Sequence, residues 1–316
     1  MTETASQPFQ SQQASAREER LGALLVFLSA VCWSFGGAIA RFIETDDPWT
    51  IVFWRSLWAI LFLVGFMLWR DGARGTLRIF LGMGRPGFAV ACCFAIASTA
   101  FVVALGYTTV ANILLMQAGV PLVAALMAWL IFRENVSMGT WLAVAAVICG
   151  VSIMVSESLT GEVSPVGDGL AALITMALAS ATVITRRFSE VRMTPATCLA
   201  AVFAMTFAAT RAGSFAVSPR DMGLLFAFGA LNLGLGLALF ASGARLVPAA
   251  LAALLGTFEP ILGPIWVWLA HSEVPSARTL LGGSVVFLAL LSYLVVEFRR
   301  QPSSAPVRPT GISGPH

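Results

Sequence analysis

Residues 259–276 read EPILGPIWVWLAHSEVPS, and this stretch repeats an earlier part of the chain. With an offset of 139 residues it aligns with VPLVAALMAWLIFRENVS at residues 120–137. The coinciding residues are Pro121 with Pro260, Trp129 with Trp268, Leu130 with Leu269, Glu134 with Glu273, and Ser137 with Ser276. A match of this kind predicts a chain built from two related halves.

A second match, at an offset of 146 residues, supports the same division. It pairs Leu24 with Leu170, Ser34 with Ser180, Arg41 with Arg187, and Phe42 with Phe188. We expect the halves to cover 20–157 and 158–300, with five membrane spans in each. An odd number of spans per half places the two halves in opposite orientations, so the sequence predicts an inverted repeat.

The composition is that of an integral membrane protein. Of all residues, 58% are apolar and 11% are charged, whereas soluble domains have roughly 45–50% and 25%. Runs of about 20 apolar residues can cross a hydrocarbon core roughly 30 Å thick as helices. These runs do not alternate polar and apolar residues, which argues against a β-barrel.

We predict an all-α bundle of ten spans, flanked by disordered tails at 1–19 and 301–316, which are rich in Ser, Gln, Pro and charge. The expected spans are 21–40, 49–69, 86–106, 108–132, 139–155, 168–185, 194–210, 222–243, 248–270 and 279–297.

The arginines predict the orientation of the bundle in the membrane. The chain contains no lysine. If the N-terminus is cytoplasmic, the inner segments hold fourteen arginines and the outer segments hold four, Arg41, Arg211, Arg220 and Arg278. This asymmetry satisfies the positive-inside rule and places both termini in the cytoplasm. The same arginines are a topology signal and do not indicate a nucleic-acid partner.

Several functional classes lack the residues that they need. Without lysine there is no phosphate-binding P-loop, which excludes ATP-driven pumping by such a loop. Only His271 and His316 are present, so neither a histidine metal site nor a histidine-dependent hydrolase is expected. All five cysteines fall inside predicted spans and are interpreted as packed thiols. We therefore predict no enzyme activity, no metal and no cofactor, while a passive channel stays open as an alternative.

Glu259 is the candidate functional carboxylate, because an ionisable group near the middle of a span usually faces the bundle interior or a wet cavity. It could serve as a proton site or bind a substrate ammonium group. It could also be a structural residue that hydrogen-bonds across the bundle, for instance to Arg55. Pro121, Pro260 and Pro264 are the expected helix hinges, since proline removes a helical hydrogen bond.

Arg55 is the one arginine expected inside a span. It could bind a substrate carboxylate, or it could snorkel to the interface or form a salt bridge in the bundle. The other candidate substrate-binding residues are polar or aromatic side chains within apolar stretches, and interhelical hydrogen bonding or interface anchoring would explain any single one of them equally well. They are Trp33, Ser34, Trp54, Ser98, Tyr107, Asn112, Gln117 and Asn232.

The two five-span halves, each ending in a Pro-x7-Trp-x4-Glu pattern, resemble the EamA family of the drug/metabolite transporter superfamily. The resemblance includes ALGYTTVANILLMQAGVPLVAALMAWLIFRENVS at 104–137 and FWRS at 53–56, and within the family it is strongest to the YddG-type amino-acid exporters of bacterial inner membranes. It implies ten transmembrane helices around a central cavity between the halves, and export of amino acids or related metabolites.

We therefore expect a secondary transporter that exports aromatic and other apolar amino acids across the bacterial inner membrane by alternating access. Its partners would be a small amino-acid substrate and the lipid bilayer. It would act as a monomer, with a weak homo-oligomer as the alternative. An exporter of other small metabolites or drugs is the alternative function.

Overall fold

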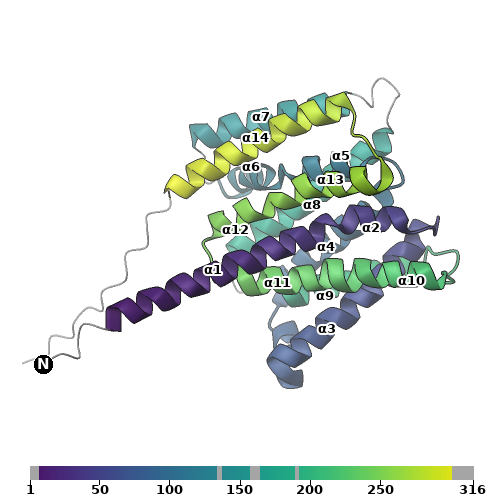
Figure 1. Ribbon diagram of the computed structural model, residues 1–316, viewed down its shortest axis with the longest axis horizontal. Coiled ribbons are helices and arrows are strands. Elements are labelled where there is room, and N and C mark those ends of the chain that lie inside the picture. The colour runs from purple at the N-terminus through teal and green to yellow at the C-terminus, as the bar shows by residue number, and fades with distance from the viewer. Residues whose placement is uncertain (1–6, 134–136, 157–163, 189–191, 301–316) are drawn as a thin grey trace, which may run out of the picture.

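The computed structural model describes residues 7–133, 137–156, 164–188 and 192–300, and these are mostly helical and contain no strand (Figure 1). The predicted all-α class is thereby confirmed. The first half contains α1 (Gln7–Ser34), α2 (Gly36–Phe42), α3 (Pro48–Leu81), α4 (Gly84–Ala104), α5 (Val110–Gln117), α6 (Val120–Phe132) and α7 (Met138–Val155). The second half contains α8 (Pro165–Arg187), α9 (Met193–Ala209), α10 (Pro219–Phe226), the π-helix η2 (Ala227–Leu235), α11 (Gly236–Gly243), α12 (Ala249–Gly256), α13 (Phe258–His271) and α14 (Ala277–Arg300).

Within these described residues, eight helical stretches are long and apolar enough to cross a membrane. A further stretch, α5 with α6, meets the same requirement as a pair bent by 42° at a short break. Helix α9 is apolar but has 17 residues. Each of the ten predicted spans thus has a helical counterpart, and eight of them meet the length and composition requirement as single stretches.

The two halves share local backbone structure at positions 139 residues apart. Helices α6 and α13 both end in a residue with left-handed backbone, Arg133 with φ of 53° and Ser272 with φ of 56°. Four residues further on, Ser137 and Ser276 cap the next helix, where their hydroxyl oxygens accept from the N–H groups of Thr140 and Thr279 at 3.2 and 3.0 Å. The sequence repeat is therefore also a structural repeat.

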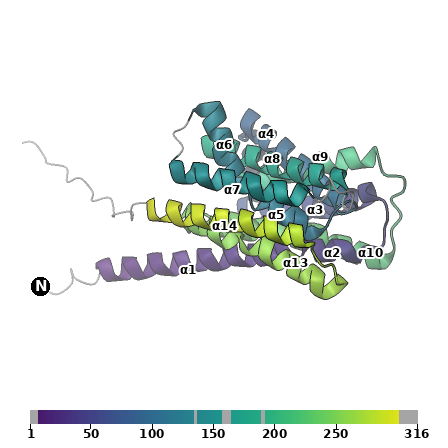
Figure 2. The ribbon, with the colours of Figure 1, turned by 90° about the horizontal axis from the view of Figure 1, so that it is seen from above.

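Helix packing also follows the repeat, because contacts between helices of the two halves occur in equivalent pairs. Helix α4 packs against α8, and their counterparts α11 and α1 pack against each other. Helix α6 packs against α8, as α13 does against α1. The last helix of each half, α7 and α14, lie side by side in both views (Figures 1 and 2). Two three-part groups result, one made of α4, α5–α6 and α8, and the other of α1–α2, α10–α11 and α12–α13.

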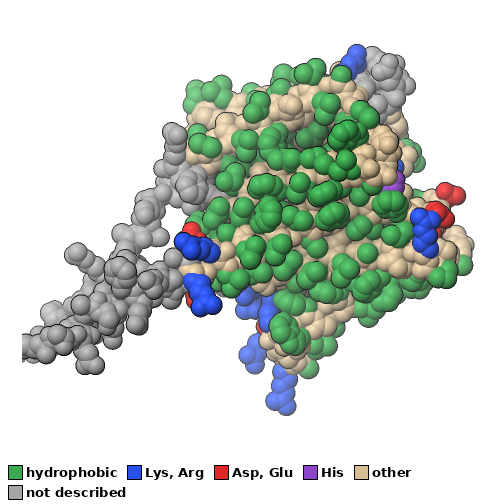
Figure 3. All heavy atoms as spheres, viewed as in Figure 1, with side chains coloured by type: hydrophobic (Ala, Val, Ile, Leu, Met, Phe, Trp, Pro, Cys, Tyr) green, Lys and Arg blue, Asp and Glu red, His purple; other side chains and the backbone are tan. Residues whose placement is uncertain are grey.

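The outside of the bundle is apolar. Side chains that the repeat pairs with each other point outward, with exposed fractions of 40% and 54% for Trp129 and Trp268 and of 70% and 64% for Leu130 and Leu269. Figure 3 shows hydrophobic side chains across the visible face and charged ones near its ends and lower edge. Lipid accounts for such a surface, since these side chains face hydrocarbon in a membrane.

The ends of the first two spans differ from the sequence prediction. Helix α1 begins at Gln7, whereas we expected a disordered tail over 1–19. Helix α3 continues to Leu81 past a break in helical geometry at Gly72, where φ is 69°. The predicted tail at 301–316 lies outside the described residues. We call the end of the bundle at the right in Figure 1 the far end. Helices α2 and α13 end there, and helices α3, α5 and α14 begin there.

Candidate functional site

A central cavity of about 240 Å³ lies inside the bundle. Six of the predicted substrate-binding residues line it, namely Trp33, Arg55, Ser98, Gln117, Asn232 and Glu259. Most of the remaining wall is apolar and includes Phe94, Phe101, Ile174, Leu178, Leu233 and Leu237. Concave, mostly apolar sites with a few convergent polar groups are typical of small-molecule binding.

The cavity is built where helices are interrupted. Gly36 follows the break between α1 and α2, Gln117 precedes the break between α5 and α6, and Glu259 follows the break between α12 and α13. Asn232 lies within the π-helix η2. Interrupted helices leave backbone groups without their usual partners, and in membrane proteins this is tolerated where the backbone is buried in protein or lines a cavity.

Asn232 supplies hydrogen bonds to one of these interruptions. Its amide donates to the carbonyl oxygens of Cys32 at 2.6 Å and Trp33 at 3.1 Å, near the end of α1. The indole of Trp266 donates to the hydroxyl of Ser34 at 3.0 Å in the same region. Helices η2 and α13 thereby hold the break in the first span in place.

Arg55 is buried, with 7% of its surface exposed. Its guanidinium donates to the hydroxyl of Ser98 at 2.9 Å, and the guanidinium carbon Cζ lies 4.2 Å from the ring centre of Phe228. The backbone at Gly229 approaches so closely that a Cβ there would meet the Arg55 carbonyl oxygen, so only glycine fits. Arg55 is therefore rigidly placed, because its charge is held by a hydroxyl and an aromatic face.

Three hydrogen-bond donors near the cavity have no protein partner within the described residues. They are Nε of Arg55, Nε2 of Gln117 and Nε1 of Trp33. An unsatisfied buried donor costs about 1–3 kcal/mol. Because all three residues line the cavity, an acceptor group of a bound solute could satisfy them.

Glu259 lines the same cavity and is partly buried. The described residues place no arginine within 4.0 Å of its carboxylate, so the alternative in which Glu259 pairs with Arg55 is not observed. One acidic and one basic side chain thus contribute to one cavity without neutralising each other.

The other predicted residues lie outside this cavity. Ser34 is buried beside Trp266, and Trp54 donates its indole N–H to the Phe215 carbonyl at 3.0 Å. Tyr107 and Asn112 line a second cavity, of about 360 Å³, at the far end. There the Asn112 amide donates to Asp168 at 2.6 Å and to the hydroxyl of Thr108 at 2.9 Å.

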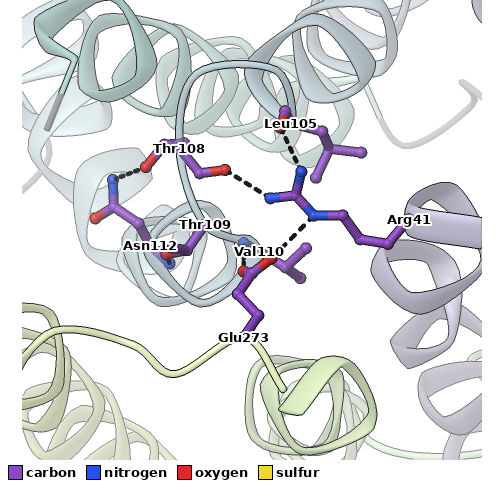
Figure 4. Close-up of polar contacts among 7 residues, drawn as sticks. All are labelled: Arg41, Leu105, Thr108, Thr109, Val110, Asn112 and Glu273. Carbon is purple, nitrogen blue, oxygen red and sulfur yellow. Dashed lines mark hydrogen bonds and ion pairs between the residues drawn. The ribbon is translucent and has the colours of Figure 1, made fainter. Parts of the chain in front are cut away.

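Arg41 and Glu273 form an ion pair at the edge of this outer cavity, with Nε and Oε2 separated by 2.9 Å (Figure 4). The Arg41 guanidinium also donates to the carbonyls of Leu105 at 2.7 Å and Thr108 at 3.0 Å. The other Glu273 oxygen accepts from the backbone N–H of Val110 at 2.8 Å and so caps α5. Sequence reasoning did not identify this far-end cluster, although the repeat had singled out both charged residues.

The three expected hinge prolines lie at or beside helix breaks. Pro121 stands in the first turn of α6, directly after the break at Ala118 and Gly119. Pro260 stands in the first turn of α13, after the break at Thr257, and Pro264 lies inside α13.

We expect Pro260→Ala to slow transport while expression and folding survive, because an N–H at position 260 could bond to the Gly256 carbonyl at the end of α12 and stiffen the break beside Glu259. Initial rates in proteoliposomes, compared with those of Pro121→Ala and of the double variant, measure the effect. Parental kinetics in all three variants would assign the prolines a packing role alone.

The described residues contain no group of three or more His, Cys, Asp or Glu side chains placed to hold a metal ion.

Comparison with known proteins gives a family match and a structural match. The sequence model of a family described as the EamA-like transporter family matches residues 20–156 and again 165–295. A solved crystal structure is similar to the chain with a TM-score of 0.62 and 16% sequence identity, covering 89% of this chain and 98% of that one. At this identity the likeness concerns the fold alone. No curated protein matches the sequence.

Proposed function

Because the chain belongs to the EamA-like transporter family, whose members carry small molecules across membranes, we propose that it exports amino acids by alternating access. The expected substrates are aromatic and other apolar amino acids, and the expected location is the bacterial inner membrane with both termini in the cytoplasm. We propose a monomer as the working unit.

The observation that carries this proposal is the pair of uncompensated charges in one apolar cavity. Arg55 and the free donors beside it suit a carboxylate, while Glu259 suits an ammonium group. Phe94, Phe101, Ile174 and Leu178 suit an apolar side chain. A zwitterionic amino acid brings these three features together, whereas an uncharged solute would leave both protein charges unpaired at a cost.

Alternating access is supported by the equivalent pairs of helix contacts that the two halves make with each other. Because α4 with α8 and α11 with α1 are counterparts, a rearrangement that opens one end of the bundle has an equivalent for the other end. We accordingly propose that the halves are inverted in the membrane and that the far end faces the outside.

Uptake into proteoliposomes tests the function directly. We expect counterflow of labelled phenylalanine, tryptophan and leucine that saturates with concentration. Flux without saturation would indicate a channel. Counterflow of other small metabolites without any amino-acid flux would show that the substrates are those metabolites and not amino acids.

The proposed orientation predicts which positions react from each side of the membrane. Single cysteines at Arg74 and Arg187 should react with an impermeant maleimide from the cytoplasmic side alone, and one at Ser164 from the outside alone, because the arginine asymmetry places the far end outside. Labelling of intact cells and inverted vesicles measures this. Labelling reversed at all three positions contradicts the proposed orientation. Arg74 and Arg187 on opposite sides, or a position that reacts from both sides, contradicts the inverted arrangement.

A further inference from the structure

The central and outer cavities lie along the same three helices. Helix α2 contributes Gly36 and Gly37 to the central cavity and Arg41 to the outer one. Helix α5 contributes Leu114 and Gln117 to the central cavity and Asn112 to the outer one. Helix α8 likewise lines both, with Ile174 and Leu178 in one and Asp168 in the other. The two spaces therefore follow one another toward the far end.

Buried apolar side chains lie between the two cavities, since Ala38 on α2, Ile113 on α5 and Ala171 on α8 each stand between residues that line different cavities. One buried cluster joins α2, α4, α5, α8 and α13, and its members include Ala38, Ala104, Val110, Ile113, Ala171 and Val267. Ala104, Val110, Ile113 and Ala171 have no exposed surface. A polar solute could not pass this layer unless the helices that form it moved apart.

The far-end cluster ties together the two helix groups that both contribute to this layer. Arg41 lies at the end of α2 and Glu273 just beyond α13, and these two helices pack together in one group. Their partners, the carbonyls of Leu105 and Thr108 and the N–H of Val110, belong to the connection between α4 and α5 in the other group. Figure 4 shows these bonds converging on that connection.

We propose that the outer cavity is the exit vestibule for the transported solute, and that α2 with the far-end cluster is the gate that closes it. Opening separates α2 and α13 from the α4–α5 connection. The Arg41–Glu273 pair lies entirely on the moving side, so both charges stay neutralised in the open state. The three hydrogen bonds to the connection are the ones that break. This inference rests on the proposed function in that the solute leaves through the far end.

Gly37 allows α2 to pack closely against the start of α5 when the gate is closed. A Cβ at this position would lie 2.4 and 2.8 Å from the two methyl carbons of Val110. Valine is stiff about χ1 and cannot turn both methyl groups away. An alanine at position 37 would therefore hold α2 off the start of α5, where the far-end cluster forms.

The test measures the gate without any transport. Nitroxides at Val166 on α8 and Val274 beyond α13, both exposed, report the distance between the two groups by pulsed electron resonance in nanodiscs. The five native cysteines are replaced in this background. We expect one short distance in the parent, and a longer distance as the main component in Gly37→Ala.

Matched variants make the result specific. Adding Val110→Ala to Gly37→Ala should restore the short distance, because it removes the two clashing methyl groups. Gly65→Ala, at a glycine with no atom near its Cβ position, should match the parent. Arg41→Gln, which loses the guanidinium donors without a clash, should lengthen the distance and serves as the deciding variant if Gly37→Ala does not fold.

The parental distance in both Gly37→Ala and Arg41→Gln would overturn the gate. Because no substrate is present, a parent that moves no amino acid would refute the proposed function and leave the distance result standing.

Discussion

Arg55→Gln is expected to lower the transport of phenylalanine about 10- to 100-fold in kcat/KM, which corresponds to the roughly 1.5–3 kcal/mol of a hydrogen bond to a charged group. Arg55 is the arginine that lines the central cavity, and its Nε has no hydrogen-bond partner among the residues that the structure describes. A substrate carboxylate would lose its charged partner in a mostly apolar site, and the amide cannot replace it. Initial uptake rates over a range of concentrations measure the loss.

A substrate analogue separates carboxylate binding from a purely structural role. Phenethylamine has the ring and the ammonium group of phenylalanine but no carboxylate, so its inhibition of transport should be the same in the parent and in Arg55→Gln. Arg220→Gln, at an exposed arginine paired with Glu44 at the far end, is the control for removing a guanidinium. Equal losses for phenylalanine and phenethylamine, with a lower melting temperature, would show that Arg55 acts through Ser98 and Phe228 as a packing residue.

Much of the fold follows from the sequence because its signals are local or periodic. Apolar runs mark the spans, since lipid requires backbone hydrogen bonds to be made within a helix. The paired prolines and tryptophans reveal the repeat, and Ser137 and Ser276 turn out to cap equivalent helices. The capping serines are readable because a helix N-terminus needs a nearby acceptor wherever it lies.

The site was less predictable because it depends on where each side chain lies along and around its packed helix. Asn112 and Gln117 lie on the same short helix, yet one lines the outer cavity and the other the central one. Their sequence context is equally apolar, so composition cannot distinguish them. The far-end cluster depends on contacts such as Arg41 to Thr108, which join segments 67 residues apart. The break between α1 and α2 at Phe35 was also not predictable from a proline, because none lies there.

Glu259→Gln is expected to lower amino-acid transport about 10- to 100-fold or to remove its dependence on pH. The loss in transport rate is expected if the carboxylate binds the substrate ammonium group, since an amide gives up a charge-assisted bond of roughly 1.5–3 kcal/mol. Loss of the pH dependence applies if Glu259 takes up and releases a proton in each cycle, because glutamine cannot ionise. Both roles require the carboxylate to be free of a permanent protein cation, and no arginine of the described residues lies within 4.0 Å of it.

Uptake into proteoliposomes between about pH 5.5 and 8.5, on either side of neutrality, distinguishes these two roles. A uniform loss at every pH assigns Glu259 to the ammonium group, and a flat profile where the parent is steep assigns it to the proton. Asp46→Asn, at an exposed acid in the loop between α2 and α3, is the control for the change in net charge and should match the parent. Glutamine is nearly isosteric with glutamate and still hydrogen-bonds, so the fold should survive. If Glu259→Gln also matches the parent in rate and apparent affinity at every pH, then Glu259 serves the packing of α13, and the zwitterion site loses its acidic half.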